Sequence, residues 1–146
     1  MKVSEIMTRE PATIGPDATL GEAATLMKQQ DCGAIPVVEN GRLVGIVTDR
    51  DIVIRAIAAG KDPKKTRAAE VMSADPITVA PDDDVNVAER EMRERQVRRL
   101  PVVEDGRLVG ILVTAQLARV ERANELGETI EEISKPASGR ASHARG

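Results

Sequence analysis

The sequence PVVENGRLVGI at residues 36–46 returns almost unchanged as PVVEDGRLVGI at residues 101–111. The two copies differ only where Asn40 is replaced by Asp105, and they lie 65 residues apart (101 − 36 = 65). The same offset relates other pairs along the chain: Pro11 and Pro76, Thr13 and Thr78, Pro16 and Pro81, Met27 and Met92. A fixed offset over so much of the chain identifies an internal duplication, so the fold must accommodate two related units.

The duplication predicts how the chain is organised. We expect repeat 1 at residues 1–61, a linker at 62–66, repeat 2 at residues 67–126 and a C-terminal extension at 127–146. The last part of that extension, residues 136–146, is small and polar, and we expect it to be disordered.

Each repeat contains a β-hairpin flanked by helices. In repeat 1 two apolar runs, Ala34–Val38 and Leu43–Val47, are joined through Asn40-Gly41, the pair that best suits a type I′ turn. Repeat 2 uses Asp105-Gly106 at the same place. A helix follows the first hairpin from Thr48 to Gly60, and its apolar face is supplied by Ile52, Val53, Ala56 and Ile57.

A short strand at Thr13-Ile14 completes the order strand, helix, strand, strand, helix, which is given twice. The pattern predicts an α/β (α+β) fold with two pseudo-symmetric β-α-β-β-α repeats. One three-stranded sheet with two helices leaves much apolar area uncovered. We therefore expect the repeats to pack sheet to sheet about a pseudo-two-fold axis, with symmetric grooves between them.

The composition excludes several classes of function. With 21 basic and 24 acidic residues the net charge is −3, and the chain has no Phe, Tyr or Trp, so neither phosphate neutralisation nor base stacking favours a nucleic-acid partner. Its one cysteine and one histidine, Cys32 and His143, argue against a disulfide or a Cys/His metal site. No apolar run approaches the roughly 20 residues of a membrane span, and no signal peptide opens the chain, so we expect no membrane and a cytoplasmic location.

The sequence resembles the tandem CBS-domain pair, also called the Bateman module. The motifs that carry the resemblance are GAIPVVENGRLVGIVTDRDI at residues 33–52, its second version RRLPVVEDGRLVGILVTAQL at residues 98–117, and an opening that begins at Ile6-Met7-Thr8. The run at residues 48–63 is similar to that of small stand-alone bacterial pairs of the hypoxic response type. The resemblance implies a non-catalytic regulatory homodimer that senses adenosine-containing molecules and acts on an effector protein that the sequence does not identify.

Thr48 and Asp51 are the central candidate residues. Their spacing predicts a capping box at the start of a helix. The resemblance implies a second role, because the segment Gly45–Asp51 matches the family pattern in which the Asp holds a ribose and the Thr contacts ribose or the first phosphate. One carboxylate can accept hydrogen bonds from both neighbouring hydroxyls of an adenosine ribose.

The resemblance also implies the walls of the Asp51 groove, which come from both repeats. Arg98 and Arg99 are candidates for phosphate contact, although they also suit a solvated basic patch, and for Arg50 we favour a surface role. No cofactor is required, and the expected ligand is AMP, ADP or ATP, with NAD and S-adenosylmethionine as alternatives. The predicted ligand-binding residues are Ile46, Thr48, Arg50, Asp51, Pro76, Ile77, Thr78, Val97, Arg98, Arg99 and Pro101.

Repeat 2 departs from the ribose pattern. Val113 and Gln116 stand at the positions of Thr48 and Asp51, so the second clamp is expected to be lost and one groove per chain to be competent. If the first clamp were only a cap, the alternative function would apply, namely a ligand-free homodimeric interaction module that regulates a partner enzyme or transporter.

Overall fold

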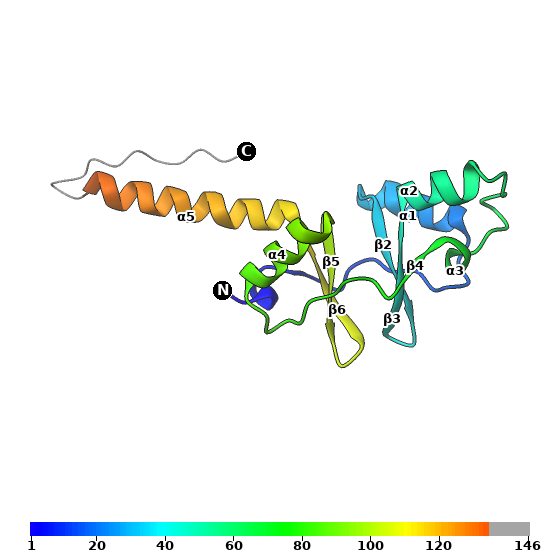
Figure 1. Cartoon of the computed structure of the whole chain (residues 1–146), viewed down its shortest axis with the longest axis horizontal. Coiled ribbons are helices and arrows are strands. Elements are labelled where there is room, and N and C mark those ends of the chain that lie inside the picture. The colour runs from blue at the N-terminus through cyan, green and yellow to red at the C-terminus, as the bar shows by residue number, and fades with distance from the viewer. Residues whose placement is uncertain (135–146) are drawn as a thin grey trace.

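The computed structural model describes the backbone of residues 1–134 and the side chains of residues 1–124. The predicted disorder of residues 136–146 falls outside the described residues. Figure 1 shows two α/β lobes side by side, each built around one β-hairpin, with a long C-terminal helix projecting from one of them. In the described part of the chain, no helix is both long and apolar enough to cross a membrane.

The first lobe comprises helix α1 (Leu20–Gln30), the hairpin strands β2 (Ala34–Glu39) and β3 (Arg42–Thr48), and helix α2 (Asp49–Asp51). A capping box between Thr19 and Glu22 starts α1, as the sequence TLGE favours. Asn40 and Gly41 both have positive φ, 54° and 80°, which a type I′ turn requires. The predicted hairpin is therefore confirmed.

The second lobe repeats this order with α4 (Val85–Arg95), β5 (Arg99–Glu104), β6 (Arg107–Val113) and α5 (Thr114–Ser134). Asp84 caps α4 because its Oδ1 accepts a hydrogen bond from the Asn86 N–H at 2.9 Å, and this bond lowers the pKa of the Asp84 carboxyl below its usual 3.8. Helix α5 continues without a break past the predicted end of repeat 2.

Each repeat sends its opening segment to the strand of the other repeat. Strand β1 (Thr8–Arg9), which follows the short helix η1 (Val3–Glu5), pairs with β6. Strand β4 (Ser73–Ala74), which follows α3 (Ala68–Val71), pairs with β3.

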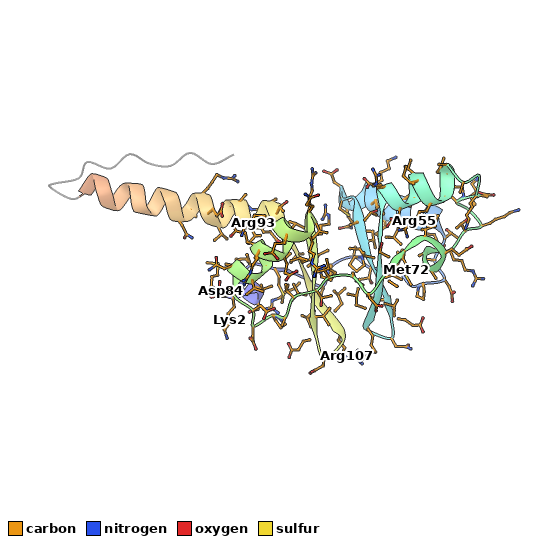
Figure 2. All side chains as sticks on the ribbon, in the orientation of Figure 1. Lys2, Arg55, Met72, Asp84, Arg93 and Arg107 are labelled. Carbon is orange, nitrogen blue, oxygen red and sulfur yellow. The ribbon has the colours of Figure 1, made fainter. Side chains whose placement is uncertain are left out.

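The hairpins also meet directly, because Arg42 of β3 pairs with Arg107 of β6. Figure 2 labels Arg107 near the tip of the second hairpin. All six strands thus join one antiparallel sheet, and the predicted α+β class is confirmed. The strand predicted at Thr13-Ile14 is reduced to a single bridge between Ile14 and Val37.

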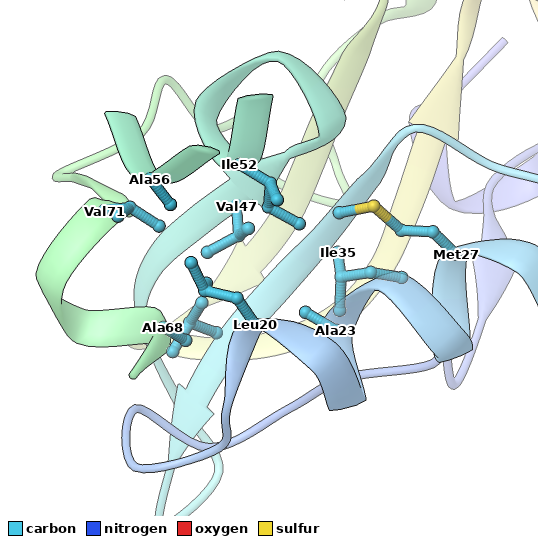
Figure 3. Packing of buried hydrophobic residues seen from close by; sticks show 10 residues of the cluster. Leu20, Ala23, Met27, Ile35, Val47, Ile52, Ala56, Ala68 and Val71 are labelled. Atoms are coloured by element: carbon cyan, nitrogen blue, oxygen red, sulfur yellow. The ribbon is translucent and has the colours of Figure 1, made fainter. Parts of the chain in front are cut away.

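The opening segments are exchanged in the hydrophobic cores as well. Figure 3 shows the first cluster, in which Ala68 and Val71, from the start of repeat 2, pack against Leu20 and Val47 of repeat 1. In the second cluster Val3 and Met7, from the start of repeat 1, are buried among residues of repeat 2, with Ile6 packed against them. Each core thus contains side chains from the opening segment of the other repeat, and neither core is complete without them. A fully buried aliphatic side chain stabilises the fold by about 1.5–3 kcal/mol.

The repeated glycine of the motif GRLVGI makes this exchange possible. A methyl group on Gly45 would lie 2.9 Å from the Ser73 carbonyl oxygen and 2.5 Å from the Met72 sulfur, and Gly110 has the same relation to Thr8 and Met7. Such separations are too short for carbon, so the crossing strands can approach only where no Cβ is present.

The helix that follows β3 differs from the prediction. After α2 the chain continues as a π-helical segment, η2 (Ile52–Ile57), in which the Ala58 N–H donates to the Val53 carbonyl at 2.8 Å. Ile52 is buried, but Val53, Ile54 and Ile57 are each 53% exposed. Only part of the expected apolar face therefore packs on the core, and the rest lies on the surface.

Candidate functional site

The Thr48–Asp51 pair forms the predicted capping box at the junction of β3 and α2. The Thr48 N–H donates to Asp51 Oδ2 at 3.0 Å, and the Asp51 N–H donates to Thr48 Oγ1 at 3.0 Å. The Asp51 side chain is only 14% exposed. The carboxylate is thus fixed in direction and largely removed from water before any ligand arrives.

The second carboxylate oxygen of Asp51 faces a cation that the sequence analysis missed. Arg55 Nε lies 3.8 Å from Asp51 Oδ1, and the same guanidinium donates to the carbonyl of Val71 at 3.2 Å. Figure 2 shows Arg55 in the same lobe as Met72, the neighbour of Val71. The signal in the sequence was the i, i+4 spacing of Asp51 and Arg55 on a predicted helix.

Repeat 2 supplies a segment beside the strand that leads to this pair. Ser73 and Ala74 pair with Ile46 and Gly45 in antiparallel register. The residues just before β4 therefore lie toward the end of β3 that carries Thr48, and residues 76–78 follow β4 toward the opposite end. Pro76 and Ile77 are half-buried and Thr78 is exposed. Ile46 is half-buried as well. The structure thus pairs β4 of repeat 2 with the strand that precedes Asp51, while a role of residues 76–78 as a wall of the site stays a prediction.

Arg99 reaches the first lobe at a different place. It lines a cavity of about 570 Å³ together with Asp31, Gly33 and Asp49, while Thr48 and Asp51 do not line it. Arg98 is exposed, and its carbonyl accepts from the Thr114 N–H at 3.0 Å. Contact of either arginine with a ligand held at Asp51 stays a prediction.

The remaining predicted residues are partly structural. Pro101 is fully buried and pairs with Ile111, and Val97 packs against the second core cluster. Arg50 is exposed, as a surface role predicts. Its backbone N–H, rather than its guanidinium, donates to Asp49 Oδ1 at 2.8 Å.

The equivalent junction in repeat 2 has a different set of contacts. The Val113 N–H donates to Gln116 Oε1 at 2.8 Å, which reproduces one half of the capping box. Valine offers no acceptor for the other half. Gln116 Nε2 instead donates to Thr8 Oγ1 at 2.8 Å. Sequence reasoning could not find this bond, because 108 residues separate the two partners.

Comparison with known proteins shows where this arrangement recurs. The CBS domain family model matches residues 3–57 and 68–122. The CBS domain-containing protein YhcV of Bacillus subtilis is 44% identical over 133 residues, which cover 90% of this chain and 94% of YhcV.

Solved structures are similar over most of the chain. Hypoxic Response Protein I, whose Mycobacterium tuberculosis sequence is 36% identical over 133 residues, covering 90% of this chain and 93% of its own, was solved with two coordinated zinc ions. It superposes with a TM-score of 0.76 at 38% identity over 82% of this chain and 98% of its own.

Two further CBS structures contain adenosine compounds. The CBS domain pair of protein MJ0100, in complex with 5′-methylthioadenosine and S-adenosylmethionine, has a TM-score of 0.75 at 30% identity over 85% of this chain and 98% of its own. CBSX2 in complex with AMP also has a TM-score of 0.75, at 25% identity over 85% of this chain and 98% of its own.

The zinc of Hypoxic Response Protein I does not carry over on the residues described. Among these, no three His, Cys, Asp or Glu side chains gather in a way that could hold a metal ion. What does carry over is the doubled fold, the match of both repeats to one family model, and the likeness to YhcV along nearly its whole length. The chain therefore belongs to the CBS domain family, and it is a tandem CBS pair of the regulatory kind, similar to the hypoxic response proteins.

Proposed function

We propose that this CBS pair is a non-catalytic sensor that binds an adenosine-containing nucleotide of the AMP, ADP or ATP class at the Thr48–Asp51 junction. The observation that carries the proposal is the state of Asp51. Its carboxylate is held by the capping box and is mostly buried, yet it keeps acceptor capacity beyond the bond from the Thr48 N–H. The adenosine compounds in MJ0100 and CBSX2 support the same ligand class.

In this proposal each part of the nucleotide has a chemically suitable partner among the predicted residues. The ribose hydroxyls donate to Asp51, and charge-assisted hydrogen bonds of this kind are the stronger ones. Ile46 and Ile77, which are both half-buried, offer aliphatic surface to the faces of an adenine. Arg50, Arg98 and Arg99 supply positive charge for phosphates. The proposed site is completed by Pro76, Thr78, Val97 and Pro101.

Binding at this site regulates by changing the relation between the two repeats. The junction lies where a strand of repeat 1 pairs with the opening segment of repeat 2. A ligand that contacts both shifts the population toward the arrangement that it binds more tightly. In this proposal the protein acts in the cytoplasm as a homodimer that senses energy state, and it signals to a separate effector protein.

Titration calorimetry on the purified protein tests the proposal. AMP, ATP, NAD and S-adenosylmethionine are titrated into the wild type and into Asp51→Ala, and a melt of the variant by circular dichroism monitors the lost cap. We expect at least one of these compounds to bind the wild type and to bind Asp51→Ala much more weakly. Equal binding by both proteins would place the site elsewhere, and no binding of any compound would contradict a nucleotide sensor.

Co-purified ligand gives an independent readout. Because the chain has no tryptophan or tyrosine, its own near-ultraviolet absorption is very weak. A purine absorption band in a thoroughly washed preparation would therefore come from bound nucleotide or from contaminating nucleic acid. Heat release followed by chromatography distinguishes these two sources and identifies the nucleotide.

One observation favours a second candidate, the ligand-free homodimeric interaction module. Val53, Ile54 and Ile57 form an apolar surface on the η2 segment, and they are among the few large hydrophobic side chains exposed in the described structure. An exposed apolar cluster of this kind is typical of a protein interface. The titration above separates the candidates, because an interaction module binds none of the four compounds while it still dimerises.

A further inference from the structure

The two ribose-clamp positions differ in what their side chains already bind. In repeat 1, Asp51 Oδ2 accepts from the Thr48 N–H, and among the described side chains the only partner of Oδ1 is Arg55, in an ion pair at 3.8 Å. In repeat 2, Gln116 uses both ends of its amide: the oxygen caps α5 and the nitrogen donates to Thr8. The internal bonds of Gln116 are both short, at 2.8 Å each.

The acceptor of the second bond lies on the crossing strand. Thr8 belongs to β1 and pairs with Ile111 of β6. Gln116 therefore joins the start of α5 to the opening segment of repeat 1, at the counterpart of the Thr48–Asp51 junction. The symmetry-related residue of Thr8 is Ser73 on β4, and no hydrogen bond joins Ser73 to Asp51 in the described structure.

The chemistry of the two side chains explains this difference. A carboxylate only accepts hydrogen bonds, so it suits a pair of hydroxyl donors, whereas a carboxamide carries its own donor and can satisfy a threonine hydroxyl from within the protein. Gln is also one methylene longer than Asp, so its amide extends further from α5. An adenosine ribose in the second groove would have to displace this bond and would gain no carboxylate in return.

We infer that the Gln116–Thr8 hydrogen bond closes the second groove from within and fastens β1 to α5, so that each chain binds one nucleotide and holds its N-terminal strand without a ligand. The statement about nucleotide number rests on the proposed function. The statement about β1 does not.

Hydrogen exchange measured by mass spectrometry tests the bond directly. Thr8→Val removes the hydroxyl acceptor and keeps the shape of the exposed side chain and the cap from Gln116. Loss of one neutral hydrogen bond corresponds to about a fivefold change in an opening equilibrium. We therefore expect peptides that cover residues 6–11 to exchange about fivefold faster. Ser73→Ala removes the matched hydroxyl on β4, where no such bond exists, and exchange of residues 71–76 should not change.

Calorimetry with AMP tests the closure of the groove. The double variant Val113→Thr, Gln116→Asp restores the full clamp and removes the donor to Thr8. We expect the wild type to bind one AMP per chain and the double variant to bind two.

Three results would overturn the inference: unchanged exchange of residues 6–11 in Thr8→Val, two AMP per wild-type chain, or one AMP per chain in the double variant. If the wild type binds no AMP, the proposed function fails in its AMP form, and the exchange result alone still decides whether Gln116 holds β1.

Discussion

A thermodynamic cycle between Asp51 and one ligand hydroxyl can isolate the proposed contact. The four measurements combine wild type and Asp51→Asn with AMP and 2′-deoxy-AMP, which lacks one hydroxyl of the ribose pair. Asp51→Asn keeps an oxygen that accepts the N–H of Thr48, so the capping box persists. What disappears is the negative charge and the second acceptor of the carboxylate.

The magnitude follows from the environment of the carboxylate. A hydrogen bond to a charged group contributes about 1.5–3 kcal/mol, and the 14% exposure of the Asp51 side chain limits competition from water. Arg55 Nε, at 3.8 Å, already satisfies part of the charge and favours the lower end of this range. Since 1.4 kcal/mol is a factor of ten, we expect 2′-deoxy-AMP to bind the wild type about ten times more weakly than AMP.

In Asp51→Asn the preference for AMP over the deoxy compound should fall to nearly nothing. Melting followed by far-ultraviolet circular dichroism supplies the structural control. Asp51→Ala removes the acceptor and should destabilise the helix start by about 0.5–2 kcal/mol, whereas Asp51→Asn should melt close to the wild type. An undiminished preference for AMP in Asp51→Asn, with the wild-type melting temperature, would refute a direct bond between this carboxylate and the ribose.

Three other predictions concern the rest of the fold. Gly45→Ala places a methyl group 2.9 Å from the Ser73 carbonyl oxygen and should cost about 1–3 kcal/mol in denaturant unfolding, while Gly60→Asn, at a positive φ that Asn tolerates and with open space around it, should cost less. If the exposed apolar side chains of η2 form the dimer interface, Ile54→Glu combined with Ile57→Glu should convert the dimer to a monomer in light scattering. The matched pair Arg119→Glu and Arg122→Glu in repeat 2 should leave the mass unchanged. An unchanged mass in the first variant would exclude the η2 surface from the interface. The folded state lowers the pKa of Asp84, so the cap stabilises the fold above the unfolded pKa, and this stabilisation is lost as pH falls through the lower folded pKa. The amide proton chemical shift of Asn86, followed by NMR, should therefore titrate below pH 3.8. Asp84→Asn should abolish that titration.

Local features of the fold could be predicted from the sequence, because their causes lie within a few residues. The Asn40-Gly41 turn needs two residues that accept positive φ, and the capping box spans three positions from Thr48 to Asp51. The exchanged strands could not be predicted in the same way. Thr8–Arg9 is two residues long, too short to show a period of two, and its partner is about a hundred residues away.

In the candidate site, too, the local features could be predicted and the contacts between distant segments could not. The cap at Asp51 was predictable because it is local, and the repeat offset identified Gln116 as its counterpart. The bond from Gln116 to Thr8 and the presence of Arg99 in a pocket with Asp49 depend on how the two lobes meet, which no local pattern encodes. A helix with 3.6 residues per turn would place Val53 and Ile57 on the buried face together with Ile52. The π-helical geometry of η2 departs from that period, and both side chains lie on the surface.

The trade of opening segments between the cores makes the two halves mutually dependent. If the chain were cut within residues 62–66, the C-terminal fragment would lose Val3 and Met7 from its core, and the N-terminal fragment would lose Ala68 and Val71. A polypeptide with a single repeat could complete its core only by exchanging its opening segment with that of another copy of itself. The tandem chain is thus equivalent to an entwined dimer whose protomers are covalently fused.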